Sequence, residues 1–484
     1  MPAECAFPTT SDVLSIRSSI SDESLAVRLS KAQVQARVHA LPAVRFEEQR
    51  LTSFAGVVLI QALFQRLDLK ARFARCFRNI RDRAAFGLHI LFLQLVLHVM
   101  LGFRCLRDRD VYDNDPMICR VLGVQRLPDV STLSRRLSVA TTECVQAVRT
   151  ECREGVLVRL ADEALARVTL DFDGSVMSTR RHAEGTAIGF NRKRKGARSY
   201  YPLFCTVAQT GQFLDFHHRP GNVHDSNGAA DFMHACVTAM RRGLPKAVIE
   251  ARMDSAFFDG DLLGQLDGES VEFTASVPFE RFPELKAIVE QTRLWSAIDD
   301  TWAFREISWA PKCWETRFRI LLIRRKSLVQ RKGPLQLDLF EPRDMEYEYK
   351  AIVTNKRCEA KAVLFFHNGR GSQEGLIGEA KVCTQLDYIP MRRRVGNQLF
   401  TAAAVLAHNL GREMQMSAKP RIHGTTPKRS ALWDFETLSH LRQRLIQRAG
   451  RLTYPQGQLT LTMSANAAAQ SDITEYLEAL QRSG

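Results

Sequence analysis

Two aspartates follow predicted strands, at positions where carboxylates suit metal chemistry. Asp173 stands near the end of the run Val168–Gly174, and Asp254 directly follows the run Ala247–Met253. Adjacent strand ends can bring carboxylates together, and oxygen ligands of this kind bind Mg²⁺ or Mn²⁺. Two such ions can activate water and stabilise the leaving oxygen in phosphodiester cleavage. The pattern predicts this chemistry if a third acid completes the site.

Asp171 is the alternative to Asp173 on the first strand. The two residues are two apart, so both side chains point to the same face. Asp173 is preferred because it is nearer the strand end and precedes Gly174. The structural alternative for these acids is that they only cap turns.

A third acid lies between two cations in a segment with a strongly helical pattern. At about 100° per residue, Arg370 lies about 40° and Lys381 about 20° from Glu374 around the helix. Glu379 lies about 140° from Glu374 around the same helix, so it is a poor substitute for Glu374 as the third acid. A carboxylate between cations suits a metal site that also holds phosphate. The alternative is an ordinary ion pair on a solvated helix.

Together these motifs resemble those of the insertion-sequence transposases that carry a DDE triad on a ribonuclease H-like core. Asp173-Gly174-Ser175 matches the family's D-G-S/T, and Asp254-Ser255-Ala256-Phe257 matches its D-S/R-x-F. The signature around the third acid, Y-(2)-R-(3)-E-(6)-K, fits by its spacing His367, Arg370, Glu374 and Lys381. Histidine replaces the usual tyrosine in the first position of that signature.

The resemblance implies a transposase that cleaves DNA at insertion-sequence ends and joins the 3′-OH ends to target DNA. Asp173, Asp254 and Glu374 would be the catalytic acids and would coordinate two Mg²⁺ (or Mn²⁺) ions. The implied partner is double-stranded DNA, as terminal inverted repeats and as target, with a homodimer formed on it. The alternative is an inactive, domesticated DNA-binding protein of transposase origin, although all three acids are present.

Several side chains are predicted to contact DNA phosphates. The resemblance assigns this role to His367, Arg370 and Lys381, and the basic loop Arg192-Lys193-Arg194 is added from its charge. The loop could equally be a solvated charge run. Trp302, in a β-rich region, either packs in the core or stacks on an unpaired base.

Charge and composition agree with a folded protein that binds a polyanion. Lys and Arg number 68 against 53 Asp and Glu, which gives a net charge of +15, and hydrophobic residues make up 45%. A field of this sign attracts nucleic acid. Phe86–Phe103 is apolar but is interpreted as a buried helix, so no membrane association is expected. The eleven scattered cysteines contain no CxxC pair, which favours reduced thiols in a cytoplasmic protein. The resemblance implies a bacterial, nucleoid-associated location.

The elements that must hold the acids form an α/β protein. Strand, hairpin, helix and strand follow one another after Val168, which predicts an α/β arrangement after an N-terminal helical domain. The resemblance implies that this arrangement is a ribonuclease H-like core interrupted by a β-rich insertion. The expected segments are a flexible arm (1–48), a helical DNA-binding domain (49–165), the first part of the core (166–268), the β-rich insertion (269–354), the second part of the core (355–416) and a C-terminal helical region (417–484).

Overall fold

The computed structural model describes residues 30–39, 41–80, 84–189, 191, 194–224, 227–326, 347–428 and 430–482. The chain divides into two compact units, Met1–Gln49 and Arg50–Gly484. In the first unit, α1 spans Lys31–His39, inside the segment that we predicted to be a flexible arm. Residues 1–29 of that arm lie outside the described residues.

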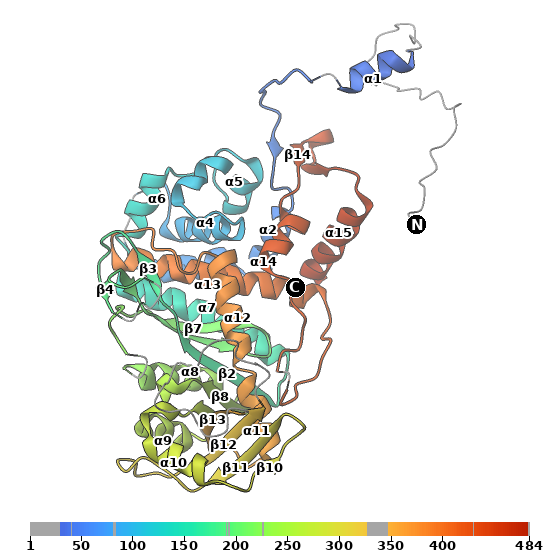
Figure 1. Ribbon diagram of the computed structural model, residues 1–484. Coiled ribbons are helices and arrows are strands. Elements are labelled where there is room, and N and C mark those ends of the chain that lie inside the picture. Colours follow the sequence, from blue (N-terminus) through green and yellow to red (C-terminus); the bar gives the residue numbers. More distant parts are fainter. Residues whose placement is uncertain are drawn as a thin grey trace. The chain divides into compact units, whose positions relative to one another are not determined.

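A mixed sheet forms the centre of the second unit (Figure 1). Within the described residues it has nine strands, in the order β10-β11-β12-β13-β9-β8-β2-β6-β7. Their bounds are β2 Arg167–Gly174, β6 Leu203–Val207, β7 Gln212–His217, β8 Val248–Met253, β9 Glu272–Ser276, β10 Ser296–Ala297, β11 Trp302–Ile307, β12 Arg319–Lys326 and β13 Tyr347–Thr354. The strands predicted from the runs at Val168 and Ala247 are confirmed as β2 and β8, with ends shifted by at most one residue, and β6 and β7 form the hairpin predicted between them.

Strand direction separates two parts of this sheet. β2, β8 and β9 are parallel, β6 and β7 run antiparallel beside β2, and β13, β12, β11 and β10 continue antiparallel from β9. β9, which follows the predicted start of the insertion at residue 269, lies inside the sheet, parallel to β8. The remaining strands of the predicted insertion extend the same sheet, because β13 pairs directly with β9.

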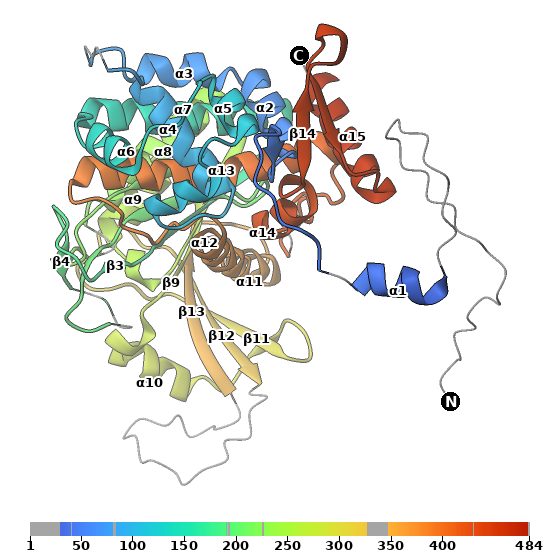
Figure 2. The same ribbon diagram turned by 90° about the horizontal axis from the view of Figure 1, so that it is seen from above.

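The two faces of the sheet differ in chemistry. One face carries the apolar residues of β2, β8 and β9, and it packs on the end of α7 and on the helices α8 (Ala229–Gly243), α9 (Gly260–Gly268) and α10 (Pro283–Gln291). The opposite face is polar along β2 and β8, where residues 167, 169, 171 and 173 alternate with the apolar positions. Two helices cover it, α11 (Ala360–Asn368) and α12 (Gly371–Cys383), and Figure 2 shows both of them above β9, β12 and β13.

A second core joins helices from both ends of the unit around the long helix α13 (Arg394–Ala418). The helices before the sheet are α2 Val57–Arg66, α3 Leu69–Cys76, α4 Leu88–Met100, α5 Pro116–Leu122, α6 Val130–Leu137 and α7 Thr142–Asp162. The segment predicted as a separate helical domain therefore shares its core with α13 and with the C-terminal helix α15 (Ala467–Arg482).

The apolar segment Phe86–Phe103 forms the buried helix α4, as predicted, and its Gln94 and His98 are fully enclosed. None of the described helices is long and apolar enough to cross a membrane.

Two small sheets complete the unit. β3 (Met177–Thr179), β4 (Ala187–Ile188) and β5 (Arg198–Tyr200) form one of them, and the predicted basic loop joins β4 to β5. The other consists of β1 (Leu51–Thr52), β14 (Gly450–Thr453) and β15 (Thr460–Met463). It brings the start of the unit against the C-terminal segment, which between α13 and α15 also contains the short helix α14 (Leu438–Leu441).

Candidate active site

The two predicted aspartates stand at the same level of two neighbouring parallel strands. β2 and β8 pair with Asp171 opposite Arg252, and two residues further along each strand come Asp173 and Asp254. Both therefore leave the sheet on the polar face at its carboxyl edge, on strands about 4.8 Å apart. Asp173 Oδ1 accepts from the Gly174 amide at 2.8 Å, and Asp254 Oδ1 accepts from the Ala256 amide at 2.9 Å. These bonds hold each carboxylate at its strand end.

Asp171 is committed to an internal ion pair. Arg252 Nε and Nη2 donate to its two carboxylate oxygens at 2.5 and 2.7 Å, and neither side chain is more than 1% exposed. Burial raises the pKa of Asp171, and the charges of Arg252 and Arg370 oppose that rise. An acid enclosed in this way cannot reach DNA or a metal at the surface, so the geometry favours Asp173 over its alternative.

Arg252 also fastens the sheet to the helix that precedes the third acid. Its Nη1 donates to the Phe366 carbonyl at the end of α11 and to Ser430 Oγ, at 3.1 and 3.3 Å. The close approach requires a glycine, because a Cβ on Gly369 would lie 2.0 Å from Arg252 Nη1. Arg252 was not among the predicted site residues, although a charged residue in the middle of a buried strand, two positions before Asp254, was the available signal.

The third acid is joined to the first by one guanidinium. Arg370 Nη2 lies 2.8 Å from Glu374 Oε1, and its Nη1 lies 3.7 Å from Asp173 Oδ2. Arg370 keeps helical backbone angles at the N-cap of α12, so the predicted common face with Glu374 is present. The Glu374 side chain is 60% exposed. The single positive charge of Arg370 therefore lies between two carboxylates and offsets one of their two negative charges.

Gln373 fixes the first turn of α12 against the strand that bears the first acid. It is 1% exposed, and its Nε2 donates to the Asp171 carbonyl at 2.7 Å. The next residue is Glu374, so this bond determines how far the third acid stands from β2. The sequence offered no signal for Gln373, because nothing in the spacing distinguishes it from an ordinary helix residue.

Glu379, the poor substitute for the third acid, points into the protein. Its carboxylate accepts from Arg412 Nη2 on α13 at 2.6 Å and from the Leu438 amide at 3.3 Å. The ion pair is largely enclosed, with side chains 8% and 15% exposed. Glu379 thus joins α12 to α13, as its predicted direction away from Glu374 requires.

His367 lies inside the protein, between α11 and β9. Its Nδ1 and Nε2 pair with the hydroxyls of Thr274 and Ser276 at 3.1 and 2.9 Å, and it is 5% exposed. Burial lowers its pKa well below the ordinary value, and the nearby Lys350 and Arg370 act in the same direction. A neutral ring with both nitrogens engaged favours a packing role over the phosphate contact that we predicted.

The other predicted phosphate ligands are spread over two regions. Lys381 lies half-buried in the last turn of α12. Arg192 and Lys193 lie outside the described residues, whereas Arg194 is exposed and its amide donates to Asn191 Oδ1 at 3.0 Å. The contacts of these residues with DNA stay predictions.

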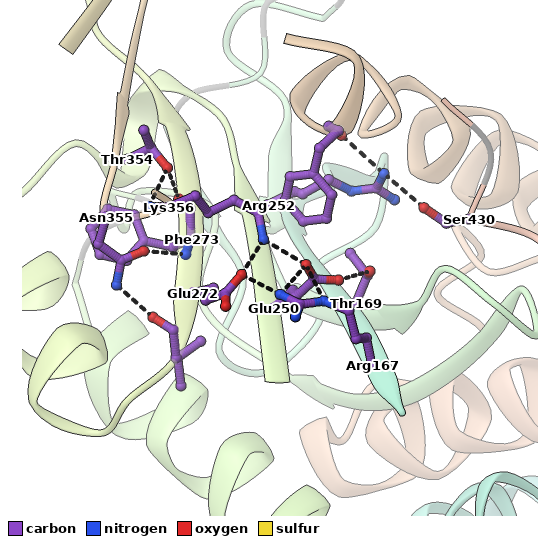
Figure 3. A network of polar contacts seen from close by, with 12 residues as sticks. Arg167, Thr169, Glu250, Arg252, Glu272, Phe273, Thr354, Asn355, Lys356 and Ser430 are labelled. Atoms are coloured by element: carbon purple, nitrogen blue, oxygen red, sulfur yellow. Dashed lines mark hydrogen bonds and ion pairs between the residues drawn. The ribbon is translucent and has the colours of Figure 1, made fainter. Parts of the chain in front are cut away.

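A charged network lies on the polar face further from the acids, at the start of β2 and β9 (Figure 3). Lys356 Nζ lies 2.5 Å from both Glu250 Oε1 and Glu272 Oε2, and Arg167 contacts the same two carboxylates. Thr169 Oγ1 donates to Glu250 at 3.1 Å. The network borders a cavity of about 360 Å³. Cations and carboxylates balance within it, so its evident role is to join β2, β8 and β9 to the segment that enters α11.

The acids suit a hard divalent cation by their chemistry, but they do not enclose one in this state. Among the described residues, no group of three or more His, Cys, Asp or Glu is close enough to hold a metal ion. Arg370 stands between Asp173 and Glu374 instead. The Glu374 side chain is largely exposed, so its carboxylate is accessible to a cation from solvent.

Comparisons with known proteins place this geometry in context. Residues 39–484 match the family model described as "Transposase DDE domain group 1". A piggyBac transposase synaptic complex with hairpin DNA matches with 12% identity and a TM-score of 0.36, over 81% of this chain and 80% of that one. A Mos1 transposase paired-end complex matches with 12% identity and a TM-score of 0.16, over 40% of this chain and 60% of that one. No curated protein matches.

Proposed function

Because the chain belongs to the transposase DDE domain group 1 family, we propose that it cleaves DNA at the ends of an insertion sequence and joins the 3′-OH ends to target DNA. The catalytic acids of this proposal are Asp173, Asp254 and Glu374. The observation that carries it is the arrangement of these three: two aspartates level on adjacent strand ends, and a glutamate linked to one of them through Arg370. The β7-β6-β2-β8-β9 part of the sheet is, on this proposal, the ribonuclease H-like core.

These carboxylates would hold two Mg²⁺ or Mn²⁺ ions. Bound there, the ions would supply Lewis-acid activation of water and stabilisation of the leaving oxygen. Asp173 and Asp254 are held in place by strand-end hydrogen bonds, and Glu374 arrives on a helix fixed by Gln373. Arg370 contacts two of the three acids and offsets one of their negative charges, and it would be free to contact a backbone phosphate once the carboxylates held their ions.

Phosphate contacts position DNA without selecting its sequence. Arg370, Lys381 and the loop Arg192-Lys193-Arg194 are proposed for that role, on double-stranded DNA that carries terminal repeats or target sequence. The net charge of +15 supports binding of such a polyanion. We propose further that the protein works as a homodimer on DNA, in the cytoplasm of a bacterium.

The test is metal-dependent strand cleavage of a plasmid that carries the element's own ends. Glu374→Gln removes a proposed ligand and keeps its shape, so cleavage should fall by more than about 100-fold, because even outer-shell partners of a metal cost 10–100-fold. Glu379→Gln is the matched control, since it makes the same chemical change on the same helix but at an inward ion pair. It should lower stability and retain cleavage.

Equal cleavage by the wild type and Glu374→Gln would remove Glu374 from the site. Loss of cleavage in Glu379→Gln but not in Glu374→Gln would make Glu379 the third catalytic acid and leave Glu374 without a catalytic role. DNA binding by the wild type without any cleavage in Mg²⁺ or Mn²⁺ would contradict the enzymatic proposal.

A further inference from the structure

Two cations meet over one tryptophan beside the proposed active site. The guanidinium of Arg325 on β12 lies 5.3 Å, and Lys350 Nζ on β13 lies 5.2 Å, from the centre of the Trp302 ring. Trp302 stands opposite Arg325 in the ladder of β11 and β12, on the sheet face that α11 covers. Attraction between a cation and an aromatic face is worth about 0.5–1 kcal/mol at exposed sites and more when water is excluded. The ring therefore holds two like charges close together.

A third cation, Arg370, lies close to this pair. Lys350 Nζ contacts Asn368 Oδ1 at the end of α11, two residues before Arg370. Burial lowers the pKa of Lys350 to about 8, and the charges of Arg325 and Arg370 add to the effect. The cluster Arg325–Lys350–Arg370 thus stores like-charge repulsion that a bound anion would relieve.

Two of the three cations in this cluster have no carboxylate paired with them among the described residues. Arg370 is paired with Glu374 and Asp173, but within the described residues neither Arg325 nor Lys350 has an ion pair. Glu348 stands opposite Arg325 in the ladder of β12 and β13, is exposed, and lies beyond ion-pair distance from it. The structural alternative, that Lys350 only caps the negative end of α11, explains neither the second cation nor their shared ring.

We propose that Arg325 and Lys350, held by Trp302, bind one backbone phosphate of the DNA strand that passes the active site. This inference rests on the proposed function, because it takes DNA as the substrate, and it adds a contact from β12 and β13 to those of α12. Trp302 acts here as the platform for the two cations, in place of the base-stacking or core-packing roles considered from sequence.

Salt dependence of DNA binding tests this contact without requiring cleavage. We would measure anisotropy of a labelled mixed-sequence duplex, about three helical turns long, in EDTA. The double variant Arg325→Gln/Lys350→Gln should reduce the slope of log K against log salt by about 1 between about 50 and 200 mM salt. The control Arg305→Gln/Arg324→Gln removes the same charge from β11 and β12 on the opposite sheet face, and its slope should stay at the wild-type value.

A Lys350→Arg variant controls for an effect of the substitution on folding. It keeps the positive charge at this position, so the slope of log K against log salt should equal the wild-type slope. Equal reductions in both double variants would overturn the phosphate site and leave the proposed function standing, since general surface charge would then account for binding. A wild type that binds no DNA would overturn both. A reduced slope in the first double variant alone supports the site, whether or not the preparation cleaves DNA.

Discussion

The buried pair of Arg252 and Asp171 allows a sharp test of how the acids are positioned. We expect Arg252→Met to destabilise the protein by about 3–4 kcal/mol at pH 7, because it leaves an unpaired carboxylate in the interior. Protonation of Asp171 limits that cost. The cost cannot exceed the free energy of protonating the Asp171 carboxylate, which is about 1.4 kcal/mol for each pH unit above the ordinary pKa of Asp, near 4. This gives a limit of about 4 kcal/mol at pH 7 and about 1.5 kcal/mol at pH 5.

The sign of this pH dependence follows from linkage. Without Arg252, the folded pKa of Asp171 lies above the unfolded one, so the folded state binds more protons and stability rises as the pH falls. Urea unfolding followed by circular dichroism at pH 5, 6 and 7 measures it, relative to the wild type at each pH. Adding Asp171→Asn to Arg252→Met should recover stability at pH 7, because the buried charge is gone.

Arg242→Met is the control for loss of an arginine. Arg242 pairs with Glu154 at the surface, with side chains 62% and 34% exposed, so its loss should cost less than about 1 kcal/mol at every pH. The reasoning fails if Arg252→Met costs no more than this control, or if its cost stays constant between pH 5 and 7.

Two other predictions concern buried polar groups on the same sheet face. His367→Phe should cost about 1–3 kcal/mol by leaving the hydroxyls of Thr274 and Ser276 without their partner, while the salt slope of DNA binding stays unchanged; a smaller slope would restore the phosphate role. Because the pKa of His367 is lowered in the folded state, its contribution to the free energy of unfolding of the wild type is lost as the pH falls below about 6.5, by up to about 1.4 kcal/mol per pH unit. This loss should be absent from His367→Phe. Lys356→Met should cost about 1–3 kcal/mol, because buried Glu250 loses its lysine but keeps its contact with Arg167. A free energy of unfolding equal to that of the wild type would contradict the proposed joining role of the network.

Local pattern was sufficient to predict the strands of the core and the positions of the acids along them. Alternation after Val168 predicted β2, and the apolar run before Asp254 predicted β8, because a strand's side-chain period is a local property. The angle between Arg370 and Glu374 could likewise be predicted, since helix geometry fixes it. The family model matched by residues 39–484 confirms the DDE transposase part of the resemblance drawn from those motifs.

Only the tertiary structure decided which polar residues are internal partners and which face outward. Asp171 and Asp173 look alike in sequence, but β8 places Arg252 against the first of them. His367 occupies the signature position of a phosphate ligand, yet β9 supplies two hydroxyls that enclose it. Likewise, β13 pairs with β9 and brings Lys350 against Asn368 at the end of α11, across a sequence separation that no local period spans. Strand order and register fix these contacts, and both depend on long-range pairing, so the spacing of residues within one segment cannot determine them.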